Sequence, residues 1–161
     1  MRRIKLDKID RKILKDLQND GRITNVELAK RAGISAPPCL RRVRSLEESG
    51  FIKGYHARIE PQAMGYGITV FALVRLTSQA EADLKSFEDT CRAWPLVREC
   101  HMLSGEVDFM LRIVAKDWDS YQRFLTENLT SAKNVTSVKT MPLVRTAKEE
   151  PGVPIDVEEA K

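Results

Sequence analysis

Hydrophobic residues recur at two different periods along this chain, and the change falls near Pro61. Before Pro61 the apolar positions step by three and four residues, as they do on one face of a helix. Beyond it, alternating and continuous apolar runs are separated by further helical patterns. The pattern therefore predicts a small helical domain followed by a domain of strands and helices.

Three helices are expected in the first part. The first spans about residues 7–19, on the apolar positions Leu6, Ile9, Ile13 and Leu17, and Asp20-Gly21 ends it. Thr24 can cap the second helix, with Glu27 as its capping-box partner. Gly33 turns the chain into the third helix, which Gly50 ends. Two helices at this spacing are typical of a helix-turn-helix unit, whose second helix enters the major groove of DNA.

The third helix has an apolar face and a basic face. Ser35 is placed to cap it, and Pro37 and Pro38 fall in the first turn, where no N–H is needed. At 100° per residue, Cys39, Val43 and Leu46 gather on one side. The opposite side carries Pro37, Pro38, Arg41, Arg44 and Ser45, with Leu40 and Arg42 on the margins. Arginine suits phosphates and guanine edges, so the pattern favours DNA binding over an ordinary solvated surface helix.

The second part predicts the order β-α-β-β-α-β. Strands are expected over 68–76, 97–103, 107–114 and about 135–144. Helices are expected from Ala80 to Trp94 and from near Asp117, the latter with Trp118, Tyr121, Leu125 and Leu129 inward. This is the order of a ferredoxin-like α+β domain, with both helices on one side of an antiparallel sheet. Because strand 68–76 is apolar on both faces, a symmetric dimer packed sheet against sheet is expected.

Charge divides the chain in the same way. Residues 1–60 hold 15 basic and 8 acidic residues, a net of +7, whereas residues 61–161 hold 12 basic and 15 acidic residues, a net of −3. A basic excess favours binding to a polyanion. Three cysteines without paired spacing, the absence of a membrane-length apolar run and an N-terminus (Met1–Lys5) without a signal-peptide core predict a cytoplasmic protein.

Four stretches together resemble the Lrp/AsnC, or feast/famine, family of regulators. They are Gly21–Leu28, Pro38–Arg44, Gly50–Tyr55 and Glu99–Asp108. The resemblance covers Leu6 to about Arg145. It implies a helix-turn-helix domain (1–52), a hinge strand (53–61), a ferredoxin-like domain for effector binding and oligomerisation (62–147) and a flexible tail (148–161).

The resemblance also implies a function and its partners. Such a protein is a bacterial, nucleoid-associated regulator of amino-acid metabolism genes that binds double-stranded DNA, dimerises, assembles further to octamers and needs no cofactor or metal. A free amino acid, with leucine or another apolar one expected first, binds between subunits. The residues expected at DNA are Thr24, Asn25, Ser35, Pro37, Pro38, Arg41, Arg42, Arg44 and Ser45. Those expected at the effector are Met102, Ser104, Gly105, Asp108, Thr140 and Met141.

The roles expected at the effector site follow from side-chain chemistry. Asp108 can accept from an ammonium group, Gly105 lets backbone approach a ligand, and Met102 and Met141 can line an apolar pocket. Glu106 stands where an aspartate is common in close relatives, and Pro142 removes a hydrogen-bond donor from the last strand.

Other functions were weighed against this one. An enzyme is disfavoured because Cys100 and His101 are neighbours on a strand and point to opposite faces. A metal held by Cys91, Cys100 and His101 is disfavoured because Cys91 is expected in the core, Cys100 on a buried strand and His101 at a dimer or surface contact. An RNA-recognition domain would display stacking aromatics with a basic signature, whereas this half is acidic. A nucleoid-associated architectural protein without an effector remains the alternative.

Overall fold

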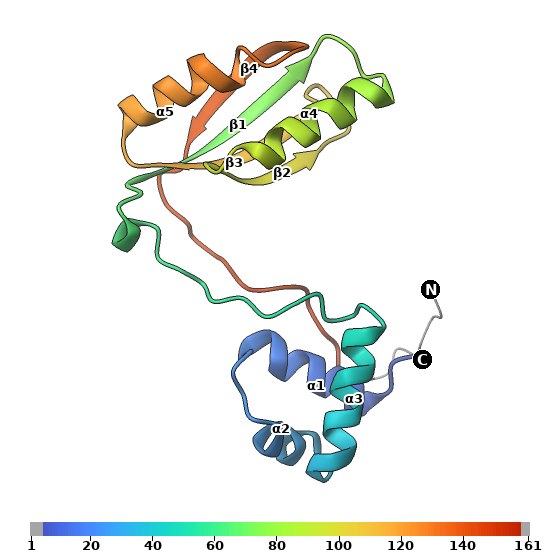
Figure 1. Cartoon of the computed structure of the whole chain (residues 1–161). Helices are drawn as coiled ribbons and strands as arrows, with labels where there is room; N and C mark the ends of the chain where they lie inside the picture. The colour runs from blue at the N-terminus through green and yellow to red at the C-terminus, as the bar shows by residue number, and fades with distance from the viewer. Residues whose placement is uncertain (1–4, 159–161) are drawn as a thin grey trace. The chain divides into compact units, whose positions relative to one another are not determined.

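The computed structural model describes residues 5–158 and divides them into two compact units. The helical unit consists of residues up to Arg58 together with residues from Lys148 onward, and the sheet unit is Ile59–Ala147. Residues 1–4 and 159–161, the outer ends of the first predicted domain and of the predicted tail, lie outside the described part. Figure 1 shows a helical first unit and a helix-covered sheet in the second.

The helical unit contains α1 (Lys8–Asn19), α2 (Asn25–Ala32) and α3 (Ala36–Glu48). Asp7 and Asp10 form a reciprocal capping box that starts α1, a device the sequence reading missed. Thr24 caps α2 as predicted, because its side chain accepts from the Glu27 backbone N–H. The Glu27 carboxylate does not complete a capping box and instead pairs with Arg31 at 3.0 Å.

The core of the helical unit is small. Its buried members are Ile13, Leu28, Ala29, Ala32, Cys39 and Leu46. Partly buried residues such as Ile9, Val43 and Ile52 pack around them. The apolar face predicted for the third helix is thus the face that packs inward.

The segment predicted as a hinge strand is not one. Residues 52–60 form no ladder, and a single 3-10 turn (Gln62–Met64) follows Pro61. A strand requires a hydrogen-bonded neighbour, and none pairs with this segment within the described chain.

The sheet unit contains β1 (Ile68–Leu76), α4 (Glu81–Ala93), β2 (Val97–Met102), β3 (Phe109–Ala115), α5 (Trp118–Phe124) and β4 (Val135–Pro142). All neighbouring strands are antiparallel, in the spatial order β2-β3-β1-β4. The predicted ferredoxin-like βαββαβ arrangement is confirmed. Pro142 is the last residue of an edge strand, where a missing N–H is tolerated.

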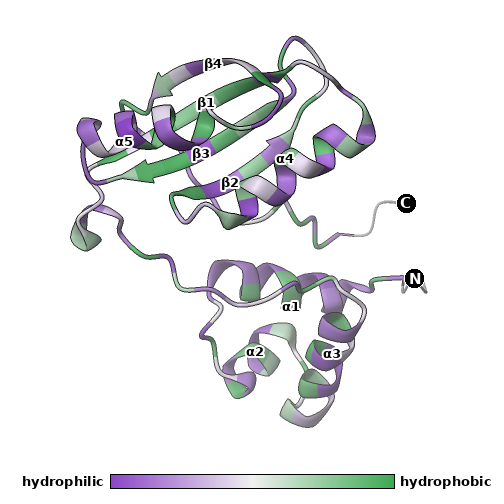
Figure 2. Ribbon diagram, turned by 45° about the horizontal axis from the view of Figure 1, so that its top comes forward, coloured by the Kyte–Doolittle hydropathy of each residue, from purple (hydrophilic) through white to green (hydrophobic). Residues whose placement is uncertain are grey.

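Both helices lie on one face of the sheet (Figure 1). The residues of β1 that point toward them, Val70, Ala72 and Val74, are fully buried with Phe109 and Leu111 of β3. Figure 2 shows hydrophobic residues along most of β3, as expected for a strand in the middle of a sheet. Phe87, Trp94 and Phe124 close the helix layer through edge-to-face contacts with ring centroids 5.4–6.3 Å apart.

The opposite face of the sheet, here called the open face, has no cover within residues 59–147, all of which are described. Phe71, Leu73 and Met110 lie there partly exposed, beside the exposed Met141. Arg112 crosses this face to Glu99, with Nε and Oε1 2.6 Å apart. The prediction that β1 is apolar on both faces is confirmed, and one face remains available.

The second helix of the sheet unit differs from its prediction. Asp117 caps α5, and the chain then widens into a π-turn (Leu125–Leu129). Tyr121 and Leu129 point inward as expected, but Trp118 is 50% exposed and Phe124 is buried instead. Both residues precede the π-turn: Trp118 is the first residue of α5, and Phe124, three residues after Tyr121, shares the inward face of the regular helix.

The C-terminal segment lies against α1. Gln18 Nε2 donates to the Val153 carbonyl at 2.8 Å, and the Val153 N–H donates to Gln18 Oε1 at 3.0 Å. This segment, predicted as a flexible tail, thus has a contact that its composition did not indicate. Among residues 5–158, no helix is long and apolar enough to cross a membrane.

Candidate functional site

The outer face of α3 is basic and exposed. Pro37, Arg41, Arg44 and Ser45 are all exposed, while Pro38 is partly buried. Neither Arg41 nor Arg44 forms an ion pair with any described residue. Two guanidinium groups one helical turn apart therefore project from one side of a helix whose other side is fixed in the core.

The turn between α2 and α3 sets the direction of that face. Gly33 ends α2 in the left-handed conformation at φ 76°, which favours glycine. Asn25 Nδ2, at the start of α2, donates to the Ala36 carbonyl at 2.9 Å. Asn25, predicted to contact DNA, thus ties the two helices together and is partly buried.

Ser35 occupies the predicted N-cap position of α3 but makes no side-chain capping bond. Its hydroxyl is exposed, and Pro37 and Pro38 remove two N–H groups from the first turn. The predicted side-chain capping bond is therefore wrong: Ser35 occupies the N-cap position, but the two prolines leave fewer N–H groups for its hydroxyl to bind.

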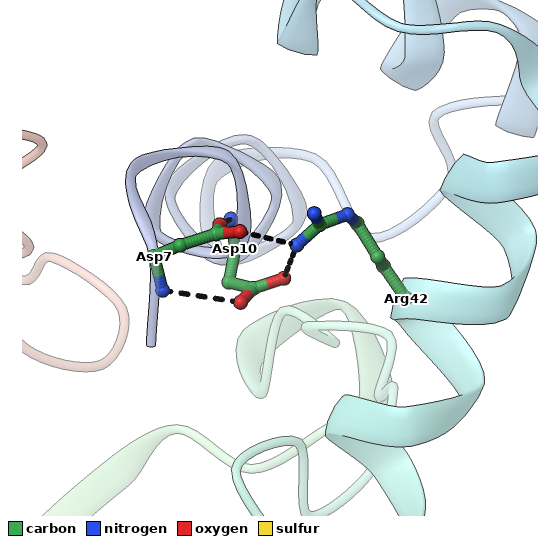
Figure 3. A network of polar contacts seen from close by, with 3 residues as sticks. All are labelled: Asp7, Asp10 and Arg42. Carbon is green, nitrogen blue, oxygen red and sulfur yellow. Dashed lines mark hydrogen bonds and ion pairs between the residues drawn. The ribbon is translucent and has the colours of Figure 1, made fainter. Parts of the chain in front are cut away.

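Arg42 lies on the side facing α1, as Figure 3 shows. Its Nη1 donates to Asp7 Oδ2 and to Asp10 Oδ1, both at 2.7 Å. These bonds raise the pKa of Arg42. Burial alone raises the pKa of Asp7, but the Asp10 N–H and Arg42 outweigh it and hold that pKa below the usual value. Arg42 therefore braces α3 against α1, and its predicted contact with DNA stays a prediction.

Leu40 is a candidate that the sequence reading left at the margin. It is 40% exposed on the same helix as Arg41 and Arg44. An exposed apolar side chain beside arginines can contact the methyl group of thymine. The signal in the sequence was its place on the margin between the two faces of the helix, at 100° per residue.

The predicted effector residues fall into two groups. Met102, Ser104, Gly105 and Asp108 lie together where β2 meets β3. The connection is longer than predicted, since β3 begins at Phe109 and the Leu103 N–H donates to the Asp108 carbonyl at 2.8 Å. Gly105 has φ 140°, a conformation that side chains rarely adopt, and nothing lies within 4 Å of the place its Cβ would occupy.

The Asp108 carboxylate already has a structural bond. Its Oδ2 accepts from the Leu76 backbone N–H at 2.6 Å and lies 3.5 Å from Gln79 Nε2. This bond closes the end of β1, where the register shifts between Arg75 and Leu76. One carboxylate oxygen is thus committed to the fold, and the acceptor role predicted for Asp108 falls to the other oxygen.

The second group, Thr140 and Met141, lies on β4 at the other edge of the sheet. Two strands separate β4 from β2, so the two groups lie on the order of 14 Å apart across the sheet. Thr140 Oγ1 is 2.7 Å from Tyr121 Oη beneath the helices, and its predicted place in an effector pocket stays a prediction. Met141 points to the open face, 36% exposed. A single chain therefore does not bring the predicted effector residues together.

The described residues offer no metal-binding cluster of histidine, cysteine or acidic side chains. A hydrogen bond between the two thiols, together with burial, raises the pKa of Cys91, and the same bond lowers the pKa of Cys100 against the opposing effect of burial. His101 points to the open face beside Glu99, as strand alternation requires.

Comparison with known proteins gives two family matches. Residues 69–153 match the Lrp/AsnC ligand binding domain, and residues 6–53 match a winged helix-turn-helix DNA-binding domain. The leucine-responsive regulatory protein of Rhizobium meliloti is 54% identical over 147 residues, 91% of this chain and 94% of the relative. That of Escherichia coli K12 is 39% identical over 144 residues, 89% of this chain and 88% of the relative.

Solved structures agree with these matches. A transcriptional regulator from Neisseria meningitidis in complex with L-Met is 34% identical, with a TM-score of 0.89 over 94% of this chain and 98% of that one. An AsnC family transcriptional regulator from Agrobacterium tumefaciens is 32% identical, with a TM-score of 0.85 over 92% and 97%.

Proposed function

This chain belongs to the Lrp/AsnC family of transcriptional regulators, and from that premise we propose that the outer face of α3 reads the major groove of duplex DNA while an amino acid bound by the sheet unit adjusts that binding. The chain is a helix-turn-helix regulator with an amino-acid binding domain, and its relatives are regulators rather than enzymes. The proposal concerns which residues carry out each step.

The observation that carries the DNA proposal is the division of labour among three arginines on one helix. Arg42 is held by two aspartates of the same unit, whereas Arg41 and Arg44 are exposed and unpaired among the described residues. An exposed guanidinium can donate two parallel hydrogen bonds to O6 and N7 of guanine, or bind a phosphate. We assign base or phosphate contacts to Arg41 and Arg44, with Pro37, Pro38, Ser45 and Ser35 lining the approach and Thr24 beside them.

An Arg41→Ala variant tests this assignment. If Arg41 contacts a base, the change weakens binding to a specific duplex by about 1–3 kcal/mol and relaxes sequence preference at one position. If it contacts a phosphate, affinity falls for all sequences alike and the salt dependence becomes shallower. Electrophoretic mobility shift at several salt concentrations separates these outcomes. Unchanged affinity in a normally folded variant would remove Arg41 from the interface.

For the effector we propose a free apolar amino acid, with leucine first and methionine second. Leucine follows from the names of the relatives, and L-Met is present in the Neisseria meningitidis structure. Ser104 and Gly105 would offer backbone amides to the carboxylate, and Asp108 would accept from the ammonium group. Met102, 59% exposed, would contact the side chain.

We propose that this site is completed by a second subunit. The two groups of effector residues are separated by the width of the sheet, so one chain supplies only part of a pocket. The open face, with Phe71, Leu73, Met110 and Met141, supports a symmetric dimer packed sheet against sheet, which would assemble further to an octamer. Such a regulator works on the chromosome, and we extend the proposal to the cytoplasm and nucleoid of a bacterium.

We propose the predicted domains as functional units, with the hinge at 53–61 joining DNA binding at 1–52 to effector binding at 62–147. The division of the structure at Arg58 and at Ala147 supports these boundaries to within a few residues. The remaining candidate function, an architectural DNA-binding protein without an effector, predicts no amino-acid binding, which calorimetry distinguishes.

A further inference from the structure

Gln18 binds the C-terminal segment by its backbone. Its side-chain amide donates to the Val153 carbonyl and accepts from the Val153 N–H, at 2.8 and 3.0 Å. A primary amide used in this way pairs with a peptide group as a neighbouring β-strand would. Seven residues earlier on α1, Arg11 Nη1 donates to the Asp156 carbonyl at 3.3 Å. Two polar side chains, two helical turns apart, therefore hold the main chain of residues 153–156.

Gly152 fits this contact through its lack of a side chain. It has φ 65°, in the left-handed region, and a Cβ at this position would lie 2.0 Å from Gln18 Oε1. Any larger residue would be strained and would displace the amide that binds Val153. Glycine at position 152 therefore leaves room for the Gln18 amide that binds the next residue, Val153.

A groove beneath the segment supplies apolar contact. A cavity of about 400 Å³ is bounded by Leu14 and Leu17 of α1, by Phe51 and Tyr55, and by residues 153–155. Tyr55 Oη donates to Glu47 Oε1 at 3.0 Å, which fixes one wall of this groove. Val153 and Ile155 contribute branched apolar side chains at its rim. Because only six residues are fully buried in the core of this unit, added apolar cover matters to its stability.

Charge favours the same contact. Residues 148–158 carry four acidic residues and one lysine, a net of −3, and residues 1–60 carry a net of +7. Arg58 pairs with Glu149 at the start of the segment. This attraction contributes little free energy in the bound state, because the charged groups are exposed. It also draws the segment toward the helical unit before contact is made.

We infer that the groove along α1 is a binding site for this chain's own C-terminal segment, which acts as a strap on the helical unit. Because the strap begins six residues after β4 ends at Pro142 and is held to α1 by hydrogen bonds, it gives the sheet unit a second link to the helical unit, besides residues 53–61. A movement of β4 would then act on α1 as a pull on the strap. This role is independent of the amino-acid site proposed above.

Hydrogen–deuterium exchange of the full-length protein tests the inference. The Val153 amide should exchange more slowly than the same amide in a free peptide of residues 148–158. Gln18→Ala removes both bonds and should speed that exchange roughly tenfold. Gly152→Val should have the same effect from the other side of the contact, whereas Glu150→Ala, which removes a carboxylate paired with Lys148 and no bond to α1, should change the exchange far less. Free-peptide exchange in the parent protein would overturn the strap.

An oligomer assembled from two different variants of the chain tests whether the strap binds within its own chain. A chain truncated after Ala147 keeps the groove without the strap, and the Gln18→Ala chain keeps the strap with a damaged groove. When the two are assembled together, segments 148–158 should remain unprotected. Protection restored in the mixture would mean that the strap crosses to a neighbouring subunit, and would overturn the intramolecular assignment.

Discussion

Replacing Arg42 by glutamine should destabilise the helical unit while leaving the DNA-reading face of α3 in place. The change removes two charge-assisted bonds of 2.7 Å, to Asp7 and to Asp10. Asp10, with only 12% of its side chain exposed, then keeps just its bond from the Asp7 N–H. Such bonds contribute about 1.5–3 kcal/mol each when shielded, but the Arg42 and Asp7 side chains are 33% and 46% exposed.

After allowance for that exposure, we expect a loss of about 2 kcal/mol in the free energy of unfolding. For a unit of this size the melting temperature should fall by roughly 10 °C. The loss should also depend on pH. The pKa of Asp7 is lowered in the folded state, so its contribution is present above its unfolded value near 3.8 and is lost as pH falls through the folded pKa. The gap between parent and variant should therefore narrow below about pH 4.

Circular dichroism melts at pH 7, 5 and 3.5, paired with mobility-shift titrations, measure both effects. Arg41→Gln is the matched control, since it makes the same chemical change on the exposed side of the helix. Arg41→Gln should lose DNA affinity and keep the melting temperature of the parent protein. Arg42→Gln should lower the melting temperature and keep most of the DNA affinity. If Arg42→Gln has the same melting temperature as the parent protein at pH 7 and loses as much DNA affinity as Arg41→Gln, the bracing role of Arg42 is refuted.

Two further predictions concern the sheet unit. Phe71→Asp places a charge on the open face and should shift the protein to monomers in sedimentation velocity, whereas Ser86→Asp, on the exposed side of α4, should not. If the Phe71→Asp protein stays associated, the subunits meet at another surface. Asp108→Asn keeps an oxygen for the Leu76 N–H but removes the charge, so calorimetry should detect weaker binding of leucine or methionine while the melting temperature stays unchanged. Binding as tight as that of the parent protein would exclude Asp108 as the ammonium acceptor.

The fold was predictable from sequence because each element carries its own period. Alternation along Val70, Ala72 and Val74 identified a strand, and steps of three and four residues identified α1 and α4. These local signals, with the glycine at the turn, were enough to give the helix-turn-helix and the βαββαβ order. The departures lie at the ends of elements, as at Trp118, the first residue of α5, which is half exposed although the pattern placed it inward.

The candidate sites were harder to predict, because side-chain partners come from other elements. Arg42 sits at the margin of its own helix, and only the aspartates of α1 decide that it points inward. Thr140 and Met141 are neighbours, but strand alternation sends one to Tyr121 and the other to the open face. The C-terminal segment looked mobile by composition, since no local pattern indicates that Gln18, 135 residues away, binds its backbone.

The helical unit draws its residues from both ends of the chain, up to Arg58 and from Lys148 onward. During translation its three helices emerge first, and the intervening residues 59–147 take roughly 5–20 seconds to add at about 5–20 residues per second. Throughout that interval the groove along α1 is bare and the nascent unit depends on its small core alone. The helical unit is therefore complete only after β4 has been synthesised, so every finished copy of it already carries the whole sheet unit.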